Sequence, residues 1–402
     1  LRTSRKWSWG KGSGTTRRRG ASAPAPAVTF RGMLTPPQAA LLEEAEAVGR
    51  DLASVSRHSG RVDRELVAAL ADAGLLPRLY PPEGLSAMDL CLIRQGLARA
   101  NTAAETAFAM QGLGSYPIYQ SARPEVRDRW IPAVSRGEVV PAFALTEPEA
   151  GSDAAALSLA AERDGTGWRL SGEKAWISNA PDADVYVVFA RTTPEAGSRG
   201  VSAFLVPGDS PGLTGVAVDM LSPHPIGHLT FDGVPVPVEH LLGEVDAGFA
   251  VAMATLDLFR PSVGAFAVGM AEAALRIAAE HARRREAFGR PIFEFQAVSH
   301  RLAEMATRVN AARLLVYEAA RAYDEGDRDR LKGAAAMAKL YATETAQYVV
   351  DGAVQVLGAQ ALEATHPLAG LYRDVRAPRI YEGTSEIQRE IIARQLRLGR
   401  LL

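Results

Sequence analysis

The sequence predicts an α+β fold in three parts: a helical N-terminal domain, a middle antiparallel β-domain and a C-terminal bundle of long helices. Three observations support this prediction. Apolar residues recur at helical spacing over residues 35–139, short alternating segments separated by turn residues fill 140–246, and long alanine-rich helical patterns return from 247 to the end. The 402 residues are enough for two or three domains with a large core.

The first 32 residues differ from the rest of the chain. They hold eight basic residues and no acidic one, so residues 33–402 carry a formal net charge of −9 within the total of −1. We interpret residues 1–32 as a disordered basic tail; a transit peptide or a nucleic-acid-binding arm is the alternative. The negative body argues against a main domain that binds nucleic acid, so no nucleic-acid partner is expected.

Cysteine and hydropathy narrow the function classes further. The single cysteine, Cys91, excludes an intrachain disulfide and any multi-cysteine metal cluster. His224 and His228 are four residues apart, but without carboxylates or cysteines nearby they favour loop structure over a metal site. No stretch approaches 18 uncharged apolar residues, so we expect no membrane-spanning helix and no membrane partner. A bacterial-type cytoplasm is the expected location, and the mitochondrial matrix is the alternative.

The predicted N-terminal helices occupy residues 33–139. Pro36 and Pro37 suit the first turn of a helix, Asp63 is a candidate N-cap, and Gly74 is a candidate helix end. The expected helices span residues 38–58, 64–73, 86–100, 102–113 and 123–135.

The middle domain, 140–246, is expected to be a barrel-like antiparallel sheet. Its segments are short and often alternate, as strands with one buried face do. The turn signals are Asp164-Gly165, Ser171-Gly172, Ser210-Pro211-Gly212 and Asp232-Gly233. The expected strands span residues 143–145, 158–163, 167–170, 174–178, 185–191, 202–207, 214–219 and 228–231.

The C-terminal domain, 247–402, is expected to be a four-helix bundle. Apolar stripes on alanine-rich segments predict long antiparallel helices at 249–284, 291–325 and 330–357, and a shorter terminal helix at 385–398.

Common nucleotide and hydrolase signatures are absent from the sequence: it has no G-x-G-x-x-G after a strand, no Walker loop, no G-x-S-x-G and no H-E-x-x-H. Four other stretches contain residues that could carry chemistry. Taken one at a time, each has a purely structural explanation: a surface turn, a buried aromatic residue, a corner between two helices and a helix cap. They are the hydroxyl-rich loop 143–153, the aromatic and hydroxyl two apart in 174–179, the basic helix end 285–296, and Tyr-Glu-Gly-Thr-Ser-Glu-Ile-Gln at 381–388.

Together and in this order, the four stretches resemble the acyl-CoA dehydrogenase family over residues 35–400. Supporting matches are Gly243-Glu244, Gly248-Phe249, Leu256-Asp257-x-x-Arg260, Gln355-Val-Leu-Gly358 and Tyr372-Arg-Asp374. The resemblance implies FAD as cofactor, held between the β-domain and the C-terminal helices.

The resemblance also assigns residues to the cofactor and to the substrate. Trp176 and Ser178 correspond to the residues that contact the flavin ring. Arg285, Phe288 and Gln296 correspond to positions that a neighbouring subunit provides for the ADP part of FAD. The cofactor positions are Phe143, Leu145, Thr146, Ser152, Trp176, Ser178, Arg285, Phe288, Gln296, Gln355, Gly358, Thr384 and Glu386. The substrate positions are Ser152, Asp257, Arg260, Tyr381 and Gly383. Sites shared between subunits imply an oligomer, which in this family is a homotetramer.

Glu382 corresponds to the catalytic base of the family. Removal of a proton α to a thioester suits a carboxylate in a dry cavity, where burial raises its pKa towards neutrality. The β-hydride then goes to flavin N5 and leaves a trans-2-enoyl thioester. Some members carry the base just before the arginine equivalent to Arg260; here that position is Phe259, which is consistent with a single base at Glu382 and favours the straight-chain or α-branched type.

Two departures from the family pattern leave alternatives open. The loop usually of Gly-x-Arg-x-Ser-Thr type is Leu-Ser-Pro-His-Pro-Ile-Gly-His at 221–228, and a usual Gly-Gly is Gly358-Ala359. The leading interpretation is an acyl-CoA dehydrogenase that passes electrons to an electron-transferring flavoprotein. The alternatives are a dehydrogenase of acyl-carrier-protein thioesters in secondary metabolism, an oxygen-using acyl-CoA oxidase, and a non-catalytic FAD-stabilised scaffold.

Overall fold

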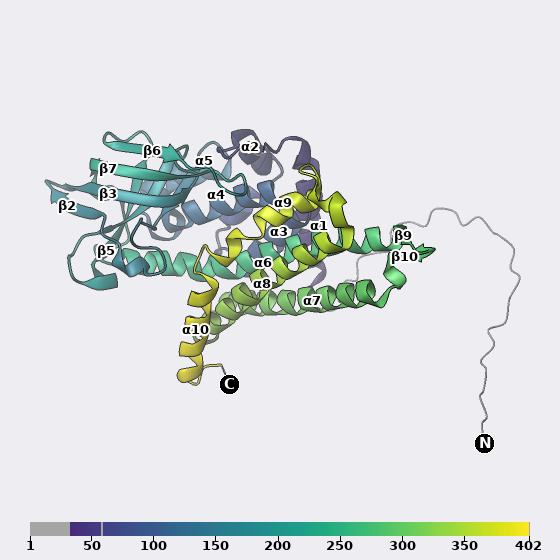
Figure 1. Ribbon diagram of the computed structural model, residues 1–402. Helices are drawn as coiled ribbons and strands as arrows, with labels where there is room; N and C mark the ends of the chain where they lie inside the picture. Colours follow the sequence, from purple (N-terminus) through teal and green to yellow (C-terminus); the bar gives the residue numbers. More distant parts are fainter. Residues whose placement is uncertain (1–32, 58, 402) are drawn as a thin grey trace, which may run out of the picture.

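A computed structural model describes residues 33–57 and 59–401, so the predicted tail at 1–32 lies outside the described residues. The strands of the main sheet gather at one end of the molecule, and the long helices extend away from them towards the other end, where a separate two-stranded hairpin lies (Figure 1). The predicted order of helical, β and helical regions is confirmed.

Five helices form the N-terminal region, and side-chain caps begin most of them. Thr35 starts the first with a capping box, and Asp63, Ser86 and Asn101 each accept a backbone N–H at the start of a later helix. The helices are α1 (Pro36–Asp51), α2 (Arg64–Asp72), α3 (Ala87–Ala100), α4 (Thr102–Ser121) and α5 (Pro124–Ser135).

Two predicted helix ends in this region are wrong. The helix predicted over 38–58 ends at Asp51 and continues only as the short 3-10 turn Leu52–Ser54, where the Ser56 hydroxyl bonds back to the Leu52 carbonyl. The helix predicted over 102–113 runs on to Ser121. Its Gly114 does not end it, because that glycine is the point where the helix touches strand β1: a Cβ there would lie 2.8 Å from the Ala142 nitrogen.

The middle region forms one sheet in which strands far apart in the chain are neighbours. The strand order is β6-β7-β3-β2-β4-β5-β8, with β1 paired to β4. The strands are β1 (Pro141–Ala144), β2 (Ala160–Asp164), β3 (Gly167–Ser178), β4 (Val185–Arg191), β5 (Val201–Pro207), β6 (Leu213–Ala217), β7 (Ile226–Val236) and β8 (Leu241–Leu242).

The sheet departs from the expectation in three ways. It is not wholly antiparallel, because β1 runs parallel to β4. The predicted turn at Ser171-Gly172 is a bulge inside the continuous strand β3, where Gly172 has φ 138° and sits against Leu159. The predicted turn at Asp232-Gly233 likewise lies inside β7, since pairing with β3 continues past it to Val236.

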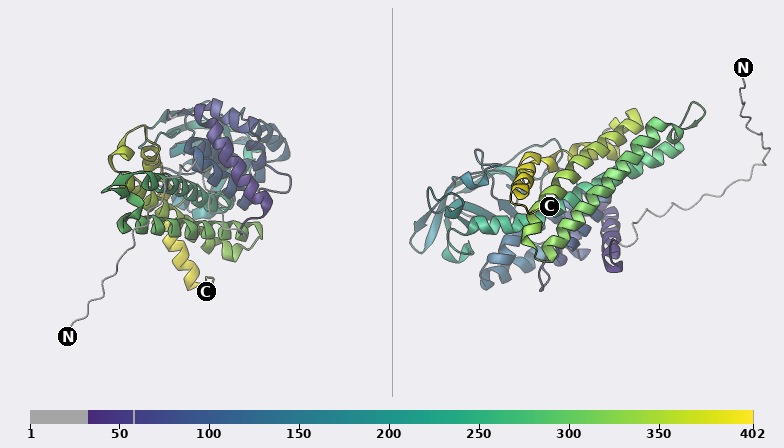
Figure 2. Two further views of the ribbon diagram at one scale, coloured as in Figure 1. Left: turned by 90° about the vertical axis from the view of Figure 1, so that its right-hand side faces the viewer. Right: turned by 90° about the horizontal axis from the view of Figure 1, so that it is seen from below.

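The C-terminal region is built on three long helices: α6 (Gly248–Arg284), α7 (Gln296–Asp324) and α8 (Arg328–Leu357). They lie side by side and run to the end that is remote from the sheet (Figure 2). Between α6 and α7 is a hairpin of β9 (Glu286–Ala287) and β10 (Arg290–Pro291), so the helix predicted from 291 begins at Gln296. The sequence analysis missed α9 (Pro367–Asp374), whereas α10 (Ser385–Arg397) was expected.

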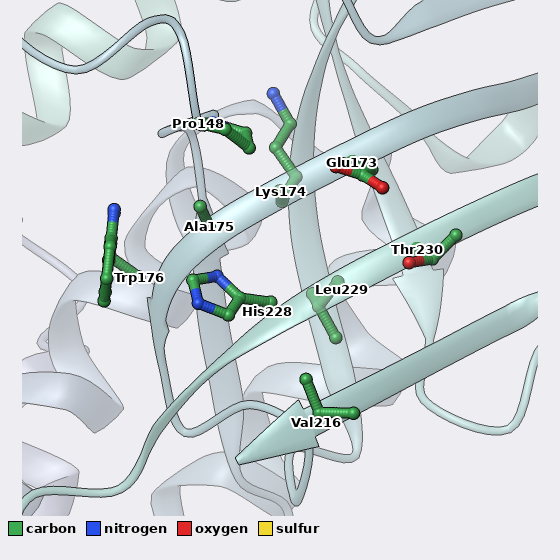
Figure 3. Close-up of a pocket in the computed structure, with 9 residues that line it drawn as sticks. All are labelled: Pro148, Glu173, Lys174, Ala175, Trp176, Val216, His228, Leu229 and Thr230. Atoms are coloured by element: carbon green, nitrogen blue, oxygen red, sulfur yellow. The ribbon is translucent and has the colours of Figure 1, made fainter. Parts of the chain in front are cut away.

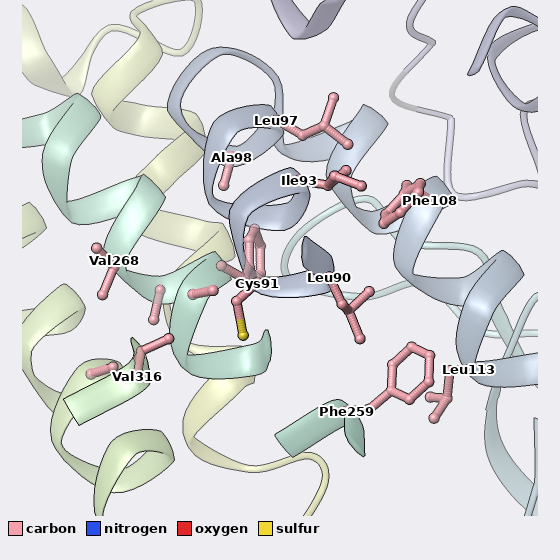
Figure 4. Packing of buried hydrophobic residues seen from close by; sticks show 14 of the residues in the cluster. Leu90, Cys91, Ile93, Leu97, Ala98, Phe108, Leu113, Phe259, Val268 and Val316 are labelled. Carbon is pink, nitrogen blue, oxygen red and sulfur yellow. The ribbon is translucent and has the colours of Figure 1, made fainter. Parts of the chain in front are cut away.

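Helix α6 is the centre of the molecule. By length and composition alone it could cross a membrane, but 67% of its most apolar window is buried inside the protein, which fits a core helix. It packs between α3 on one side and α7 and α8 on the other. Figure 4 shows side chains of α3, α4 and α6 in this core, among them Cys91, Leu113 and Phe259.

Candidate active site

The segment that joins the last two helices, residues 380–384, has an unusual backbone. Glu382 has φ 53° and Gly383 has φ 93°, so two consecutive residues are in the left-handed region. A non-glycine residue held there costs on the order of 1–3 kcal/mol and persists only where the surroundings impose it. Such strain is concentrated at functional sites, and here it falls on the predicted base.

Hydrogen bonds from three different helices impose this backbone. Lys339 Nζ of α8 donates to the Gly383 carbonyl at 2.6 Å, and Gln388 Nε2 of α10 donates to the same oxygen at 3.0 Å. Arg260 Nε of α6 reaches the Glu382 carbonyl at 3.4 Å. The two carbonyls therefore point into the protein, where these donors fix them.

The carboxyl group of Glu382 is buried and incompletely satisfied. Its Oε2 atom has no hydrogen-bond partner among the described residues. Burial raises the pKa of Glu382 above its ordinary value, and the cations Arg94, Arg260 and Lys339 oppose that rise. The Glu382 backbone N–H also makes no hydrogen bond within residues 33–57 and 59–401. Among the described residues, Glu382 therefore has an acceptor without a partner, Oε2, and a donor without a partner, its backbone N–H.

A buried ion pair near Glu382 escaped the sequence analysis. Arg94 Nε of α3 donates to Glu105 Oε1 of α4 at 2.5 Å, and the two side chains are only 2% and 1% exposed. Arg94 Nη1 continues to the Ser262 hydroxyl of α6 at 2.6 Å. The signal for Arg94 was present in the sequence: its helical neighbours at three and four residues, Leu90, Cys91, Leu97 and Ala98, are all apolar and buried.

Asp374, at the end of α9, connects the three regions around this site. One of its oxygens accepts the Thr102 hydroxyl of α4 at 2.7 Å, and the other accepts the Ser222 hydroxyl from the loop before β7. The altered loop 221–228 is therefore bonded to the segment that leads into Glu382. Phe259, where a base was excluded, is fully buried and makes an edge-on contact with the Tyr116 ring.

The predicted flavin-facing residues lie at the end of β3. Trp176 has φ 57° and is 51% exposed, and its ring meets His228 edge-on at 4.7 Å between centroids. The Ser178 hydroxyl lies 2.8 Å from Nε2 of His224. Figure 3 shows Trp176 and His228 at one end of an open hollow of about 480 Å³, with Glu173 and Thr230 at the other.

The hydroxyl-rich loop 143–153 is hydrogen-bonded to β3, the strand that carries Trp176 and Ser178. Lys174 Nζ donates to the Leu145 carbonyl at 3.0 Å and to Glu147 Oε1 at 2.8 Å, and the Thr146 carbonyl accepts the Ala175 N–H. Phe143 packs on Phe189 at 4.8 Å between ring centroids. Ser152 is exposed in the same loop. Phe143, Leu145, Thr146, Trp176 and Ser178 are thus brought together on one edge of the sheet.

Three other predicted cofactor residues lie far from this edge. Arg285, Phe288 and Gln296 surround the β9–β10 hairpin at the opposite end of the long helices (Figure 1). Phe288 is 96% exposed, with φ 51°, and its ring lies edge-on to the Phe295 ring at the start of α7. Gln355 and Gly358 are exposed at the end of α8, while Thr384 caps α10 and Glu386 is exposed in its first turn. One chain does not unite the three hairpin residues with β3.

The residues near β3 fit a flavin. An exposed aromatic ring beside a hydroxyl, next to backbone groups of a hydroxyl-bearing loop, offers a stacking surface and polar contacts for a planar heterocycle. No group of three His, Cys, Asp or Glu side chains that could hold a metal occurs in the described part of the chain. The remote hairpin fits only if another copy of the chain presents it.

The comparisons with known proteins agree with this geometry. Three sequence-family descriptions match in order: acyl-CoA dehydrogenase N-terminal domain over residues 38–138, middle domain over 142–234 and C-terminal domain over 246–397. Cyclohexane-1-carbonyl-CoA dehydrogenase of Geobacter metallireducens is 36% identical over 346 residues, covering 84% of this chain and 90% of that protein.

Solved structures extend the likeness to the whole fold. Butyryl-CoA dehydrogenase from Megasphaera elsdenii has a TM-score of 0.84 at 32% identity, covering 90% of this chain and 98% of its own. The FAD complex of PigA has a TM-score of 0.84 at 28% identity, covering 91% and 99%. With matches along nearly its full length, this chain belongs to the acyl-CoA dehydrogenase family.

Proposed function

We propose that Glu382 is the base that removes the α-proton of an acyl-CoA thioester in the reaction that gives the trans-2-enoyl-CoA. The observation that carries this assignment is a buried carboxyl group with an unpartnered oxygen, held in a strained left-handed backbone. As a family member, the chain is an FAD-dependent oxidoreductase that acts on the CH–CH group of acyl-CoA.

The residues around Glu382 supply the rest of the acid–base chemistry. Its free carboxylate oxygen accepts the α-proton, and its raised pKa brings it nearer to the weak acidity of that carbon. Its own backbone N–H, which has no other acceptor among the described residues, donates to the thioester oxygen as negative charge develops there. FAD, when bound, takes up the β-hydrogen as a hydride.

The other site residues orient the two ligands. Phe143, Leu145, Thr146, Ser152, Trp176 and Ser178 would hold the flavin beside β3. Thr384 and Glu386, at the start of α10, would make further contacts with the cofactor. Asp257 and Arg260, an ion pair at 3.4 Å on α6, would face the CoA arm near Tyr381 and Gly383. Arg260 then has two roles, since it also bonds the Glu382 carbonyl.

Oligomer, location and electron acceptor follow as further parts of the proposal. Arg285, Phe288 and Gln296 would serve the cofactor of another copy, which supports an oligomer, in this family a homotetramer. Gln355 and Gly358 would lie beneath the pyrophosphate of the cofactor. An electron-transferring flavoprotein would remove the electrons. A bacterial-type cytoplasm stays the proposed location, and the domain limits 33–139, 140–246 and 247–402 stay predictions.

Anaerobic titration of the FAD-loaded protein tests the assignment. Acyl-CoAs of graded length and branching should abolish the visible flavin absorbance, and Glu382→Gln should slow that reduction by about 10²–10⁴-fold while the flavin stays bound. Glu390→Gln, an exposed carboxylate on the neighbouring helix, should reduce at the wild-type rate. Equal rates in Glu382→Gln and wild type would remove Glu382 from the mechanism.

The same titration separates the alternatives. Reduction only by acyl-carrier-protein thioesters would favour the carrier-linked dehydrogenase, an alternative motivated by the altered loop that bonds Asp374. Rapid reoxidation by air with release of hydrogen peroxide would indicate an oxidase. No reduction by any thioester would support a non-catalytic scaffold.

A further inference from the structure

The two histidines of the altered loop contact the two residues assigned to the flavin ring. His224 meets Ser178 through a hydrogen bond of 2.8 Å, and His228 meets Trp176 edge-on. The sequence analysis assigned both histidines to loop structure and gave them no part in the site. These contacts place both histidines beside the residues assigned to the flavin ring.

We propose that His224 is a positioning residue for the flavin site: its imidazole fixes the Ser178 hydroxyl so that the hydroxyl proton points at the bound cofactor. This inference rests on the proposed binding of FAD beside β3. It goes beyond that proposal because it assigns a role to the loop where the chain departs from its family.

The proposed role follows from the hydrogen-bonding capacity of a serine hydroxyl. It has one proton to donate and can accept at its oxygen. If Nε2–H of His224 donates to Ser178 Oγ, one of the two acceptor positions of the oxygen is occupied on the protein side, and the hydroxyl proton cannot point at His224. The hydroxyl proton is then free for one acceptor, and the nitrogen-rich flavin ring offers acceptors. A serine without this partner would rotate among several orientations.

The proposal assigns the single N–H of a neutral His224 ring to Nε2, the nitrogen that faces Ser178 Oγ; in the other tautomer the serine would donate to the ring. Partial burial lowers the pKa of His224 to about 4, so the ring is neutral near pH 7 and carries a single N–H. Because charged side chains do not contribute to that shift, no ion pair competes for the ring. Backbone contacts fix the loop: the Pro225 carbonyl accepts the Asn179 N–H at 2.8 Å, and Ser222 bonds Asp374.

Substitutions at position 224 test the role. His224→Leu removes the donor but fills similar volume, whereas His224→Gln keeps an N–H donor at a comparable distance from the backbone. We expect His224→Leu to weaken FAD binding and to slow flavin reduction by about three- to tenfold each, the effect of one neutral hydrogen bond. It should also change the visible absorption band of the bound flavin. His224→Gln should restore all three readouts towards wild type.

The partner residue provides the decisive comparison. In a Ser178→Ala background, His224→Leu should have no additional effect on the FAD dissociation constant or the absorption band, because the hydroxyl it orients is gone. His240→Gln, a partly buried histidine of the same region, controls for loss of an imidazole as such. Fluorescence titration with FAD and thermal unfolding of the loaded protein complete the set.

Three outcomes would overturn the inference. It fails if His224→Leu binds FAD with the wild-type dissociation constant and absorption band, if its effect is undiminished in Ser178→Ala, or if His224→Gln is as impaired as His224→Leu. Failure of the proposed function would look different, since wild-type protein would then show no flavin reduction by any thioester.

Discussion

The buried pair of Arg94 and Glu105 gives the strongest prediction about stability. The Nε–Oε1 distance is 2.5 Å, both side chains are essentially inaccessible, and Arg94 has a second bond to Ser262. Arg94→Met would leave the Glu105 carboxylate buried without its cation. Removal of one partner of such a pair costs about 3–5 kcal/mol of unfolding free energy, because the remaining charge stays desolvated. The double variant Arg94→Met/Glu105→Leu should cost far less, since no charge is left behind.

Urea unfolding of the four proteins in this cycle measures the effect. A surface pair of the same chemistry is the control: Arg308 Nε and Glu304 Oε1 lie 2.6 Å apart on α7, but their side chains are 39% and 48% exposed. Loss of that pair should cost about 0–1 kcal/mol. The reasoning is refuted if Arg94→Met costs no more than Arg308→Met, or if the double variant loses the sum of the two single losses.

The same pair should also act on the catalytic base, with opposite signs for its two members. Arg94 attracts the Glu382 carboxylate and lowers its pKa. Glu105 and Glu382 repel each other when both are ionised, a repulsion that raises the pKa of Glu105 and by reciprocity disfavours ionised Glu382. Because the base works deprotonated, the acid limb of the pH–rate profile follows this pKa. Glu105→Gln should move the limb to lower pH and Arg94→Met to higher pH. Shifts in the same direction would contradict this electrostatic account.

Three further predictions concern the segments that carry the site. Lys339→Met should move the acid limb of flavin reduction to higher pH, because the ammonium group favours ionised Glu382; an unmoved limb would exclude that interaction. Gly383→Ala should lower the melting temperature and the reduction rate together, since φ is 93° and a Cβ would lie 2.6 Å from Gln388 Nε2; wild-type behaviour would show that the backbone relaxes freely. Burial alone would raise the pKa of Glu147, but Lys174 and the N–H groups of Ser158 and Leu159 hold it below its usual value. That carboxylate therefore stabilises the fold above the unfolded pKa and loses this effect as pH falls, so Glu147→Gln should flatten the acid side of a melting-temperature profile; an unchanged slope would refute this.

The sequence predicted local structure well where one segment decides it alone. The caps at Asp63 and Thr384, and the long helix that begins near Gly248, depend on residues within a few positions of each other. Errors arose where a distant segment overrides a local signal. Gly114 is typical of a helix end, but it is the point where α4 contacts β1. Gly172 is typical of a turn, but it forms a bulge against Leu159. Neither of these contacts can be predicted from the residues next to the glycine in the sequence.

The site shows the same division. The prediction of the site came from motif resemblance, which assigned roles to Glu382, Trp176 and Ser178 but did not indicate the groups that hold them. His224 was visible as a departure from the family loop, yet its partner is 46 residues away in the chain. Only the pairing of β3 with β7 brings the two together. The role of such a residue depends on strand register, which the turn signals did not reveal.

Buried lysines show how far physical reasoning from sequence could be extended. Within the described residues the lysines are Lys174, Lys332 and Lys339; Lys332 is exposed and the other two are fully buried. An ammonium group is buried only where acceptors compensate for its lost hydration, and segments outside helices and strands supply spare carbonyls. Accordingly, Lys174 donates to the Leu145 carbonyl of the hydroxyl-rich loop 143–153, and Lys339 donates to the Gly383 carbonyl beside the predicted base. The helical neighbours of Lys339, Ala335, Ala336, Ala342 and Thr343, are small and buried, so its burial could be inferred from the sequence. A lysine on a face of small buried residues therefore indicates that an irregular segment lies opposite it, and here that segment carries the residue proposed to act as the base.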